Sequence, residues 1–307
     1  MPKKIWKGAI SSFFYILCTF EAETFFSFFM NKPLKYAVFG AGSWATAIVK
    51  MLSENLNEIG WYMRSVYTKE HLLREQHNPN YLSSVEFHLE QLKLSNDINE
   101  MAEWADVLFF VIPSAFVHSE LEKLTVDISN KTIVSAVKGI VPESGLVLGE
   151  HINEHYNVPF ENIAVLAGPC HAEEVALERL SYLTISSWDS KKAQHIADSL
   201  SSDYIKTKIS DDVIGIEYGV MLKNIYAIAA GIAHGLGYGD NFQSILMSNA
   251  IREMKRYIKR VHKMKRNINN SAYLGDLLVT GYSTFSRNRM FGNMIGKGYT
   301  VKSAQME

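Results

Sequence analysis

The chain has 307 residues, 47% of them hydrophobic and 21% charged, so it can bury a sizeable core and is expected to form two domains. Its 31 basic and 32 acidic residues leave a formal net charge of -1, which provides no bulk attraction for nucleic acid or for an anionic membrane. The two cysteines, Cys18 and Cys170, are too few for a disulfide framework and favour a reducing, cytoplasmic location.

Residues 1–29 are interpreted as an N-terminal extension outside the main pattern. Three lysines precede an apolar stretch, residues 9–20, which loosely resembles the start of a secretory signal. Glu21 and Glu23 interrupt it, so its apolar length falls short of the roughly 20 residues that a membrane-spanning helix needs. A signal peptide stays open as an alternative, but we favour an upstream extension with Met30 as the natural start.

From residue 35 to residue 210, short β-rich runs alternate with helical stretches. The runs are YAVF, DVLFFVI, KTIVSAV, NIAVLA and YLTISS. This alternation predicts βαβ units and a mostly parallel sheet, so residues 30–210 are expected to form an α/β Rossmann-like N-terminal domain. Segments such as GVMLKNIYAIAAGIAHG then predict an all-α C-terminal domain over residues 211–307. No linker separates the two parts, and the cleft between them is the expected active site.

A glycine-rich turn directly follows the first β-rich run. In the sequence GAGSWA, Gly40, Gly42 and Ala45 have the GxGxxG/A spacing, and a helical stretch over residues 44–56 follows. The first glycine permits the tight turn, the second lets the backbone approach a pyrophosphate, and the third small residue lets helix and strand pack closely. Amide groups at the start of the helix then bind the anion. A tight turn without a ligand is the alternative, but this position between strand and helix favours a dinucleotide.

The end of the second expected strand, residues 59–62, bears on the choice of cofactor. Enzymes that use NAD place an acid here, because a carboxylate accepts hydrogen bonds from the ribose 2′-hydroxyl. This chain has Met63, Arg64 and Ser65 instead. An arginine can meet a 2′-phosphate or stack on adenine, so we expect NADPH to be used at least as efficiently as NADH. Alternatively, Arg64 is a solvated surface residue.

Further segments follow the glycine turn in a fixed order. They are VIPS (111–114), VKG (137–139), AGP (167–169), MLKNIYAIAAGI (221–232), LGDLLVT (274–280) and FSRNRMFG (285–292). Over residues 34–307, this series closely resembles the NAD(P)-dependent glycerol-3-phosphate dehydrogenases of the bacterial biosynthetic type. The resemblance implies a cytoplasmic homodimer that interconverts dihydroxyacetone phosphate and sn-glycerol 3-phosphate with NADP or NAD, for glycerophospholipid synthesis.

Lys223 is the expected acid/base. It lies in a helical segment with the apolar neighbours Leu222, Ile225 and Tyr226, where an isolated ammonium group is costly to bury. Burial favours the neutral amine that a general base needs. The resemblance implies the same role, in which Lys223 removes the C2 hydroxyl proton during oxidation and returns it in reduction. The alternative is a lysine that extends its head group to solvent.

Asp276 is an acid among apolar residues. It would offset the cost of burying Lys223 if the two side chains meet, as the resemblance implies. As an alternative, Asp276 caps a helix. Asn224 and Thr280, near these two residues, are expected to position the substrate oxygens by hydrogen bonding.

The resemblance also implies substrate contacts from Lys138, Gly168 and Cys170. Lys138 follows the carboxyl end of an expected strand, where open α/β sheets place their ligands, although an exposed loop lysine is the alternative. Cys170 stands where many family members have threonine, and a thiol donates a weaker hydrogen bond than a hydroxyl.

The segment Ser286, Arg287 and Asn288 supplies a planar guanidinium and short polar side chains, which suit a phosphate dianion. The resemblance implies that this trio holds the substrate phosphate and that Arg287 also lies near the cofactor, whereas Arg289 is expected on the surface. The other implied cofactor contacts are Ser43, Trp44, Lys138 and Ala172. No metal-ligand spacing such as HExxH is present, so no metal is expected.

Family members continue beyond the point that matches Glu307, so the C-terminal domain is expected to be truncated. Two alternatives to the main interpretation stay open, and the truncation argues only for the second of them. One is a dehydrogenase of another hydroxy acid, although such enzymes need a carboxylate site, whereas FSRNR and Lys138 match a phosphate site in the resembling family. The other is a catalytically inactive nucleotide-binding remnant.

Overall fold

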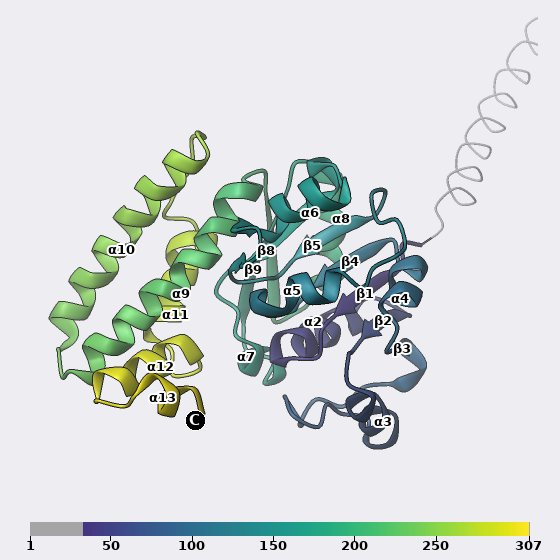
Figure 1. The fold of residues 1–307 in the computed structure, drawn as a ribbon, viewed down its shortest axis with the longest axis horizontal. Helices are drawn as coiled ribbons and strands as arrows, with labels where there is room; N and C mark the ends of the chain where they lie inside the picture. The colour runs from purple at the N-terminus through teal and green to yellow at the C-terminus, as the bar shows by residue number, and fades with distance from the viewer. Residues whose placement is uncertain (1–32, 307) are drawn as a thin grey trace, which may run out of the picture. The chain divides into compact units, whose positions relative to one another are not determined.

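An eight-stranded sheet forms the middle of the computed structural model, which describes residues 33–306 (Figure 1). The strand order is β10-β9-β8-β5-β4-β1-β2-β3, and every neighbouring pair is parallel except β8 with β9. The bounds are β1 Tyr36–Phe39, β2 Ile59–Tyr62, β3 Leu92–Ser95, β4 Val107–Phe110, β5 Thr132–Ser135, β8 Ile163–Ala167, β9 Ser181–Ser187 and β10 Ile205–Ser210. The expected mostly parallel sheet is therefore confirmed. The interpretations of residues 1–29 lie outside the described residues.

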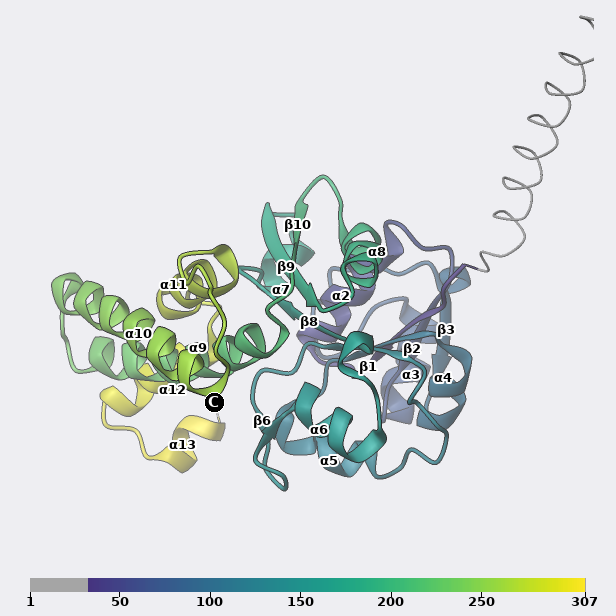
Figure 2. The ribbon, with the colours of Figure 1, turned by 90° about the horizontal axis from the view of Figure 1, so that it is seen from above.

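Helices cover both faces of this sheet, so each face has its own hydrophobic core (Figure 2). Alternate strand residues point to opposite faces: Ala37 and Phe39 of β1 enter one core, and Tyr36 and Val38 enter the other. The first core is covered by α4 (Ile98–Trp104), α5 (Ser114–Leu121), α6 (Leu148–Tyr156) and the start of α9 (Val213–Gly235). The second is covered by α2 (Ser43–Ser53), α3 (Val66–Glu75), α7 (Ala172–Ala176) and α8 (Ser190–Leu200).

Two local features differ from what the sequence predicted for this region. A short antiparallel pair, β6 (Ile140–Val141) with β7 (Leu146–Val147), lies between β5 and α6. The helix after the glycine turn runs over Ser43–Ser53, rather than over the expected residues 44–56, because Glu54 already forms its C-terminal cap.

After Ser210, every secondary-structure element of the described chain is a helix. α9 and α10 (Asp240–Val261) run side by side in opposite directions (Figures 1 and 2). A π-helical turn (Ser271–Gly275) leads into α11 (Asp276–Tyr282), followed by α12 (Arg287–Gly296) and α13 (Val301–Met306). The expected all-α C-terminal region is confirmed.

α9 is long and apolar enough to cross a membrane by length and composition alone, and it is the one such helix in the described residues. However, 61% of its most apolar window is buried inside the protein. It packs against β8, α10, α11 and α12, so its apolar side chains serve the protein core.

Glycines allow α9 and α12 to approach until their backbones touch. A Cβ atom on Gly231 of α9 would overlap the carbonyl oxygen of Arg289, and one on Gly292 of α12 would overlap the carbonyl oxygen of Ile228. Side chains at these positions would force the helices apart. The close crossing sets where the first turn of α12 lies relative to the middle of α9.

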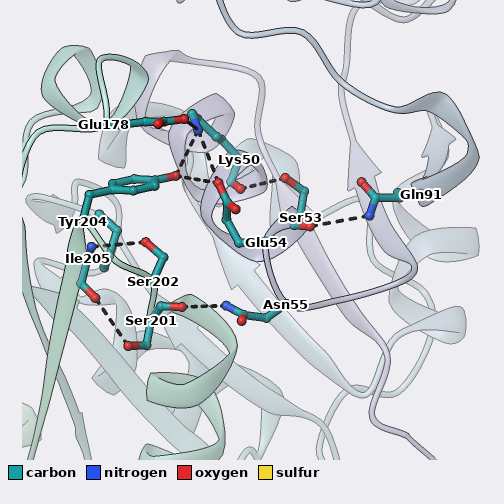
Figure 3. A network of polar contacts seen from close by, with 10 residues as sticks. All are labelled: Lys50, Ser53, Glu54, Asn55, Gln91, Glu178, Ser201, Ser202, Tyr204 and Ile205. Carbon is teal, nitrogen blue, oxygen red and sulfur yellow. Dashed lines mark hydrogen bonds and ion pairs between the residues drawn. The ribbon is translucent and has the colours of Figure 1, made fainter.

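A polar network anchors the far end of α2 (Figure 3). The Lys50 ammonium of α2 donates to Glu178 Oε1 at 2.9 Å and to the hydroxyl of Tyr204 at 3.0 Å. That hydroxyl donates to Glu54 Oε1 at 2.9 Å. The network therefore ties α2 to the segment after α7 and to the start of β10, while the opposite end of α2 forms the glycine turn.

Candidate active site

The backbone conformation at the first position of the turn after β1 requires a glycine. Gly40 has φ +129°, a conformation that residues with a side chain rarely adopt. Its amide donates to the carbonyl of Tyr62 at 3.0 Å, and an added Cβ would overlap the carbonyl oxygen of Val111. Gly40 thus lets β1, β2 and the end of β4 meet closely.

Gly42 has a different role, because nothing in the protein lies within 4 Å of where its Cβ would be. It caps the start of α2 with φ -78° and no side-chain hydrogen bond, so the first amides of α2 remain available to a ligand. Ala45, the third small residue of the motif, is fully buried against the sheet. The turn thus combines free helix-terminal amides with open space for an anion.

A groove extends from this turn past the ends of β2 and β4. Arg64 lies at its wall, with the guanidinium carbon 5.9 Å from the centre of the Phe116 ring. Its lining residues are Gly40, Ala41, Gly42, Tyr62, Arg64, Ser65, Thr68, Asn80, Tyr81, Val111, Ile112, Pro113, Phe116 and Glu120. The groove has the position of a dinucleotide site at the carboxyl ends of the strands.

A second pocket gathers residues from the strand ends and from the helical region. Among the residues suggested by the sequence, it is lined by Ser43, Trp44, Lys138, Cys170, Ala172, Lys223, Asn224, Asp276, Thr280, Ser286, Arg287 and Asn288. It is also lined by His171, Glu173 and Phe285, which the sequence reasoning did not include. His171 lies two residues after the AGP segment. This closeness to the motif is the sequence signal that could have identified it as a pocket residue.

Lys223 of α9 and Asp276 of α11 form a buried ion pair. The Lys223 ammonium donates to Asp276 Oδ1, and the two residues are 5% and 2% exposed. Asp276 Oδ2 accepts from the Gly168 amide at 3.3 Å. The carboxylate offsets the cost of burying the ammonium, and its side chain does not cap α11.

Gly168 lies behind the pocket rather than in its wall. It has φ +132°, and an added Cβ would overlap the carbonyl oxygen of Tyr182. Its described contact with the site is the hydrogen bond to Asp276. Gly168 is therefore placed to orient the acid.

Lys138 lies at the pocket, with its ammonium 5.1 Å from the centre of the Trp44 ring. Removal from bulk water and the positive charge of Lys223 lower the pKa of Lys138 to about 8. The Lys138 carbonyl accepts from Asn224 Nδ2 at 3.1 Å, which links this loop to α9.

Arg287 contacts the start of α2, next to the glycine turn that lines the groove. Its Nη2 donates to Ser43 Oγ, in the first turn of α2, at 3.2 Å. Ser286 caps α12 by accepting from the Arg289 amide at 3.3 Å. The start of α12 therefore presents Arg287 and Asn288 to the pocket beside the glycine turn.

The surroundings of two pocket residues decide which hydrogen bonds their side chains can offer to a ligand. The Thr280 hydroxyl donates to the carbonyl of Asp276 at 2.6 Å, which leaves its oxygen as an acceptor for a ligand. Burial raises the pKa of the Cys170 thiol to about 12, so the group stays protonated at neutral pH.

Arg289 is less exposed than the surface position that was expected for it. The residue is half-buried, and its Nε is enclosed without a hydrogen-bond partner in the described structure. The reason is the tight crossing of α12 on α9, which brings the Arg289 backbone against Gly231. For metals, residues 33–306 contain no group of three or more His, Cys, Asp or Glu side chains that could hold an ion.

Comparison with known proteins gives consistent matches along the chain. Residues 35–193 match the description of the NAD-dependent glycerol-3-phosphate dehydrogenase N-terminus, and residues 212–307 match that of its C-terminus. The chain is 36% identical over 267 residues to the glycerol-3-phosphate dehydrogenase (NAD(P)+) of Oceanobacillus iheyensis, covering 86% of this chain and 76% of that protein. It is 37% identical over 269 residues to that of Latilactobacillus sakei, covering 85% and 78%.

A solved structure shows the same similarity in three dimensions. The glycerol-3-phosphate dehydrogenase of Coxiella burnetii superposes with a TM-score of 0.81 at 29% identity, covering 89% of this chain and 83% of that one.

Proposed function

The chain belongs to the family of NAD-dependent glycerol-3-phosphate dehydrogenases, and we propose that its groove and its pocket divide the binding of cofactor and substrate between them. It is an NAD(P)-dependent oxidoreductase that interconverts dihydroxyacetone phosphate and sn-glycerol 3-phosphate. The observation that carries the residue assignments is the buried Lys223–Asp276 pair, which opens into the same pocket as Arg287.

The groove residues fit a dinucleotide. The uncapped start of α2 and the open space beside Gly42 suit a pyrophosphate, and Arg64 and Phe116 offer a cation and an aromatic face beyond it. Arg287 bridges to Ser43 at the border between groove and pocket. When bound, the cofactor supplies the hydride for reduction of the ketone.

Lys223 moves the proton in this proposal. Its ammonium gives a proton to the C2 oxygen of dihydroxyacetone phosphate during reduction, and its amine takes that proton back during oxidation. Asp276 holds the Lys223 head group by accepting from it, and the Gly168 amide in turn orients Asp276. The catalytic residues are thus Lys223 and Asp276.

The phosphate of the substrate is held by the start of α12 and by Lys138. Arg287 offers a planar pair of N–H donors, Asn288 and Ser286 offer short polar side chains, and Lys138 adds a positive charge. Asn224, Thr280 and Cys170 line the rest of the pocket, where they contact the substrate's other oxygens.

Initial rates of NADH and NADPH oxidation with dihydroxyacetone phosphate test the proposed function directly. We expect oxidation that depends on the phosphorylated ketone and is absent with unphosphorylated dihydroxyacetone, because the pocket is built for a phosphate. Equal rates with both ketones would contradict the assignment of the α12 residues.

We predict that Gly42→Ala weakens nucleotide binding without unfolding the protein. The added methyl group meets no protein atom, but it occupies the space where the backbone must approach the pyrophosphate. We expect the Kd for NADH, measured by calorimetry, to rise about tenfold or more. Gly239→Ala is the matched control, because Gly239 also caps a helix with a negative φ and open space around it. Unchanged NADH affinity in Gly42→Ala would contradict the cofactor assignment.

We predict that Arg287→Lys chiefly weakens substrate binding. Lysine keeps the positive charge but loses the bidentate geometry, at a cost of about 1–3 kcal/mol for a charged hydrogen bond. The KM for dihydroxyacetone phosphate should rise accordingly in steady-state kinetics. Arg256→Lys, at an exposed position of α10, should leave KM unchanged. An unchanged KM in Arg287→Lys would count against its phosphate role.

We further propose that residues 30–210 act as the NAD(P)-binding domain and residues 211–307 as the substrate domain of a cytoplasmic homodimer. The position of the last strand, ending at Ser210, and of the first long helix, beginning at Val213, supports this division. Large apolar side chains exposed on α9, α10 and α12, such as Ile225, Ile245 and Met290, support association with a second copy.

A further inference from the structure

Helix α5 carries an acid on its buried face. Glu120 is 3% exposed and lies beside the fully buried Leu121, three residues after the fully buried Val117. A charged residue on such a face needs partners. Glu120 Oε2 accepts from the hydroxyl of Tyr62, the last residue of β2, at 2.8 Å.

Two basic residues contact the other carboxylate oxygen. Glu120 Oε1 accepts from Lys123 Nζ at 2.7 Å and lies 3.5 Å from Arg64 Nη1. Burial acts to raise the pKa of Glu120, but the hydrogen bonds from Lys123 and Tyr62 outweigh it and hold this pKa below its usual range. Glu120 is therefore a carboxylate at neutral pH.

This carboxylate lies where sequence reasoning found no acid. Glu120 lines the groove together with Arg64 and Ser65, which lie two and three residues after the end of β2. In dinucleotide-binding sheets, an acid at the end of the second strand accepts hydrogen bonds from the ribose 2′-hydroxyl. Here β2 ends without an acid, but α5 delivers one to the last β2 residue through the Tyr62 hydrogen bond.

We propose that Glu120 is a specificity-determining residue that biases the groove toward NAD(H) and against NADP(H). The inference rests on the proposed binding of a dinucleotide in this groove. A hydroxyl can donate to a carboxylate, whereas a 2′-phosphate carries only acceptors and negative charge at neutral pH and is repelled. Glu120 also pairs with Arg64, the residue otherwise available to a 2′-phosphate.

Lys123 and Arg64 counter part of this effect, since both are positive and contact the same carboxylate oxygen. They also explain why a buried acid is tolerated here. The expectation drawn from Arg64 alone, that NADPH is used at least as efficiently as NADH, leaves Glu120 out of account. Glu120 therefore shifts the ratio between the affinities for the two cofactors, while Arg64 and Lys123 limit the size of that shift.

Glu120→Gln tests the proposal, because it removes the charge while keeping the shape and an acceptor for Tyr62. The Kd values for NADH and NADPH are measured by calorimetry on the full chain without substrate. We expect the ratio of the NADPH Kd to the NADH Kd to fall about tenfold in the variant. If Glu120 has a purely structural role, the variant binds both nucleotides more weakly by the same factor and the ratio of the two Kd values is unchanged. That result would overturn the proposal.

Glu122→Gln is the matched control, since it removes the same charge two residues away. The Glu122 side chain is 64% exposed, pairs with His118 at 3.3 Å and does not line the groove. In Glu122→Gln, the ratio of the NADPH Kd to the NADH Kd should stay at the wild-type value. A shift of this ratio equal to that in Glu120→Gln would overturn the proposal. If wild type binds neither nucleotide, dinucleotide binding itself fails. If it binds both and Glu120→Gln leaves the ratio unchanged, only the role of Glu120 fails.

Discussion

Lys223→Met is expected to lower kcat by roughly 10²- to 10⁴-fold, the usual contribution of general acid–base catalysis. Methionine keeps most of the side-chain volume but cannot carry a proton. Lys223 does not line the nucleotide groove. The Kd for NADH should therefore hardly change. Rapid kinetics and calorimetry on the same preparation measure the two quantities.

Lys223→Met also breaks a buried ion pair, so its effect on stability is separated from its effect on catalysis with a second variant. Removing Lys223 leaves Asp276 as a buried charge without its cation, and breaking such a pair costs about 3–5 kcal/mol. Lys223→Met combined with Asp276→Asn removes both charges, so it should be more stable than the single variant and equally inactive. Recovery of near-normal kcat in the double variant would refute the assignment of Lys223.

His171 is the competing proton carrier, because it lines the same pocket. Burial, together with the charges of Lys138 and Lys223, lowers the pKa of His171, so the imidazole is neutral at pH 7. His171→Asn should therefore reduce kcat far less than Lys223→Met. The opposite order of effects would move the acid/base role from Lys223 to His171.

Gly292→Ala is expected to destabilise the protein by on the order of 3 kcal/mol and to abolish most activity. The added methyl group would overlap the carbonyl oxygen of Ile228, and its next neighbours are also backbone atoms of α9. Backbone cannot rotate away as a side chain can, so α12 must move off α9. That movement displaces Arg287 and Asn288 from the pocket.

Thermal unfolding and the KM for dihydroxyacetone phosphate together measure this effect. Gly239→Ala serves again as the control, since it adds the same methyl group in the helical region without a contact. A melting temperature and KM close to those of wild type in Gly292→Ala would show that the α9–α12 crossing does not position the phosphate site.

The local pattern of the sequence was sufficient for the six inner strands of the large sheet and for the glycine turn, but not for the less buried edge strands β3 and β10. A buried strand needs a run of apolar residues, and Gly40 needs a conformation that glycine adopts freely, so both are visible without a partner. The switch from strands to helices after Ser210 was visible for the same reason. Motif order then identified most of the residues that line the pocket.

Only the tertiary structure decided which of these side chains meet. Lys223 and Asp276 are 53 positions apart, and Arg287 and Ser43 are 244 apart, so their contacts depend on how helices cross, which no local pattern records. The same crossing encloses the Nε of the half-buried Arg289, a residue that was expected on the surface.

The tertiary structure also decided the direction of individual hydrogen bonds and the partners of charged side chains. The Thr280 hydroxyl turns to its own helix, and Gly168 serves Asp276 instead of facing the pocket. Glu120 reads along the chain as one more acid in a helix, and only the approach of α5 to the end of β2 brings it into the groove. The sequence by itself thus determined the type of fold and the residues available for chemistry. The packing of distant helices and strands determined their partners, because a side chain's partners depend on distances that only the folded chain sets.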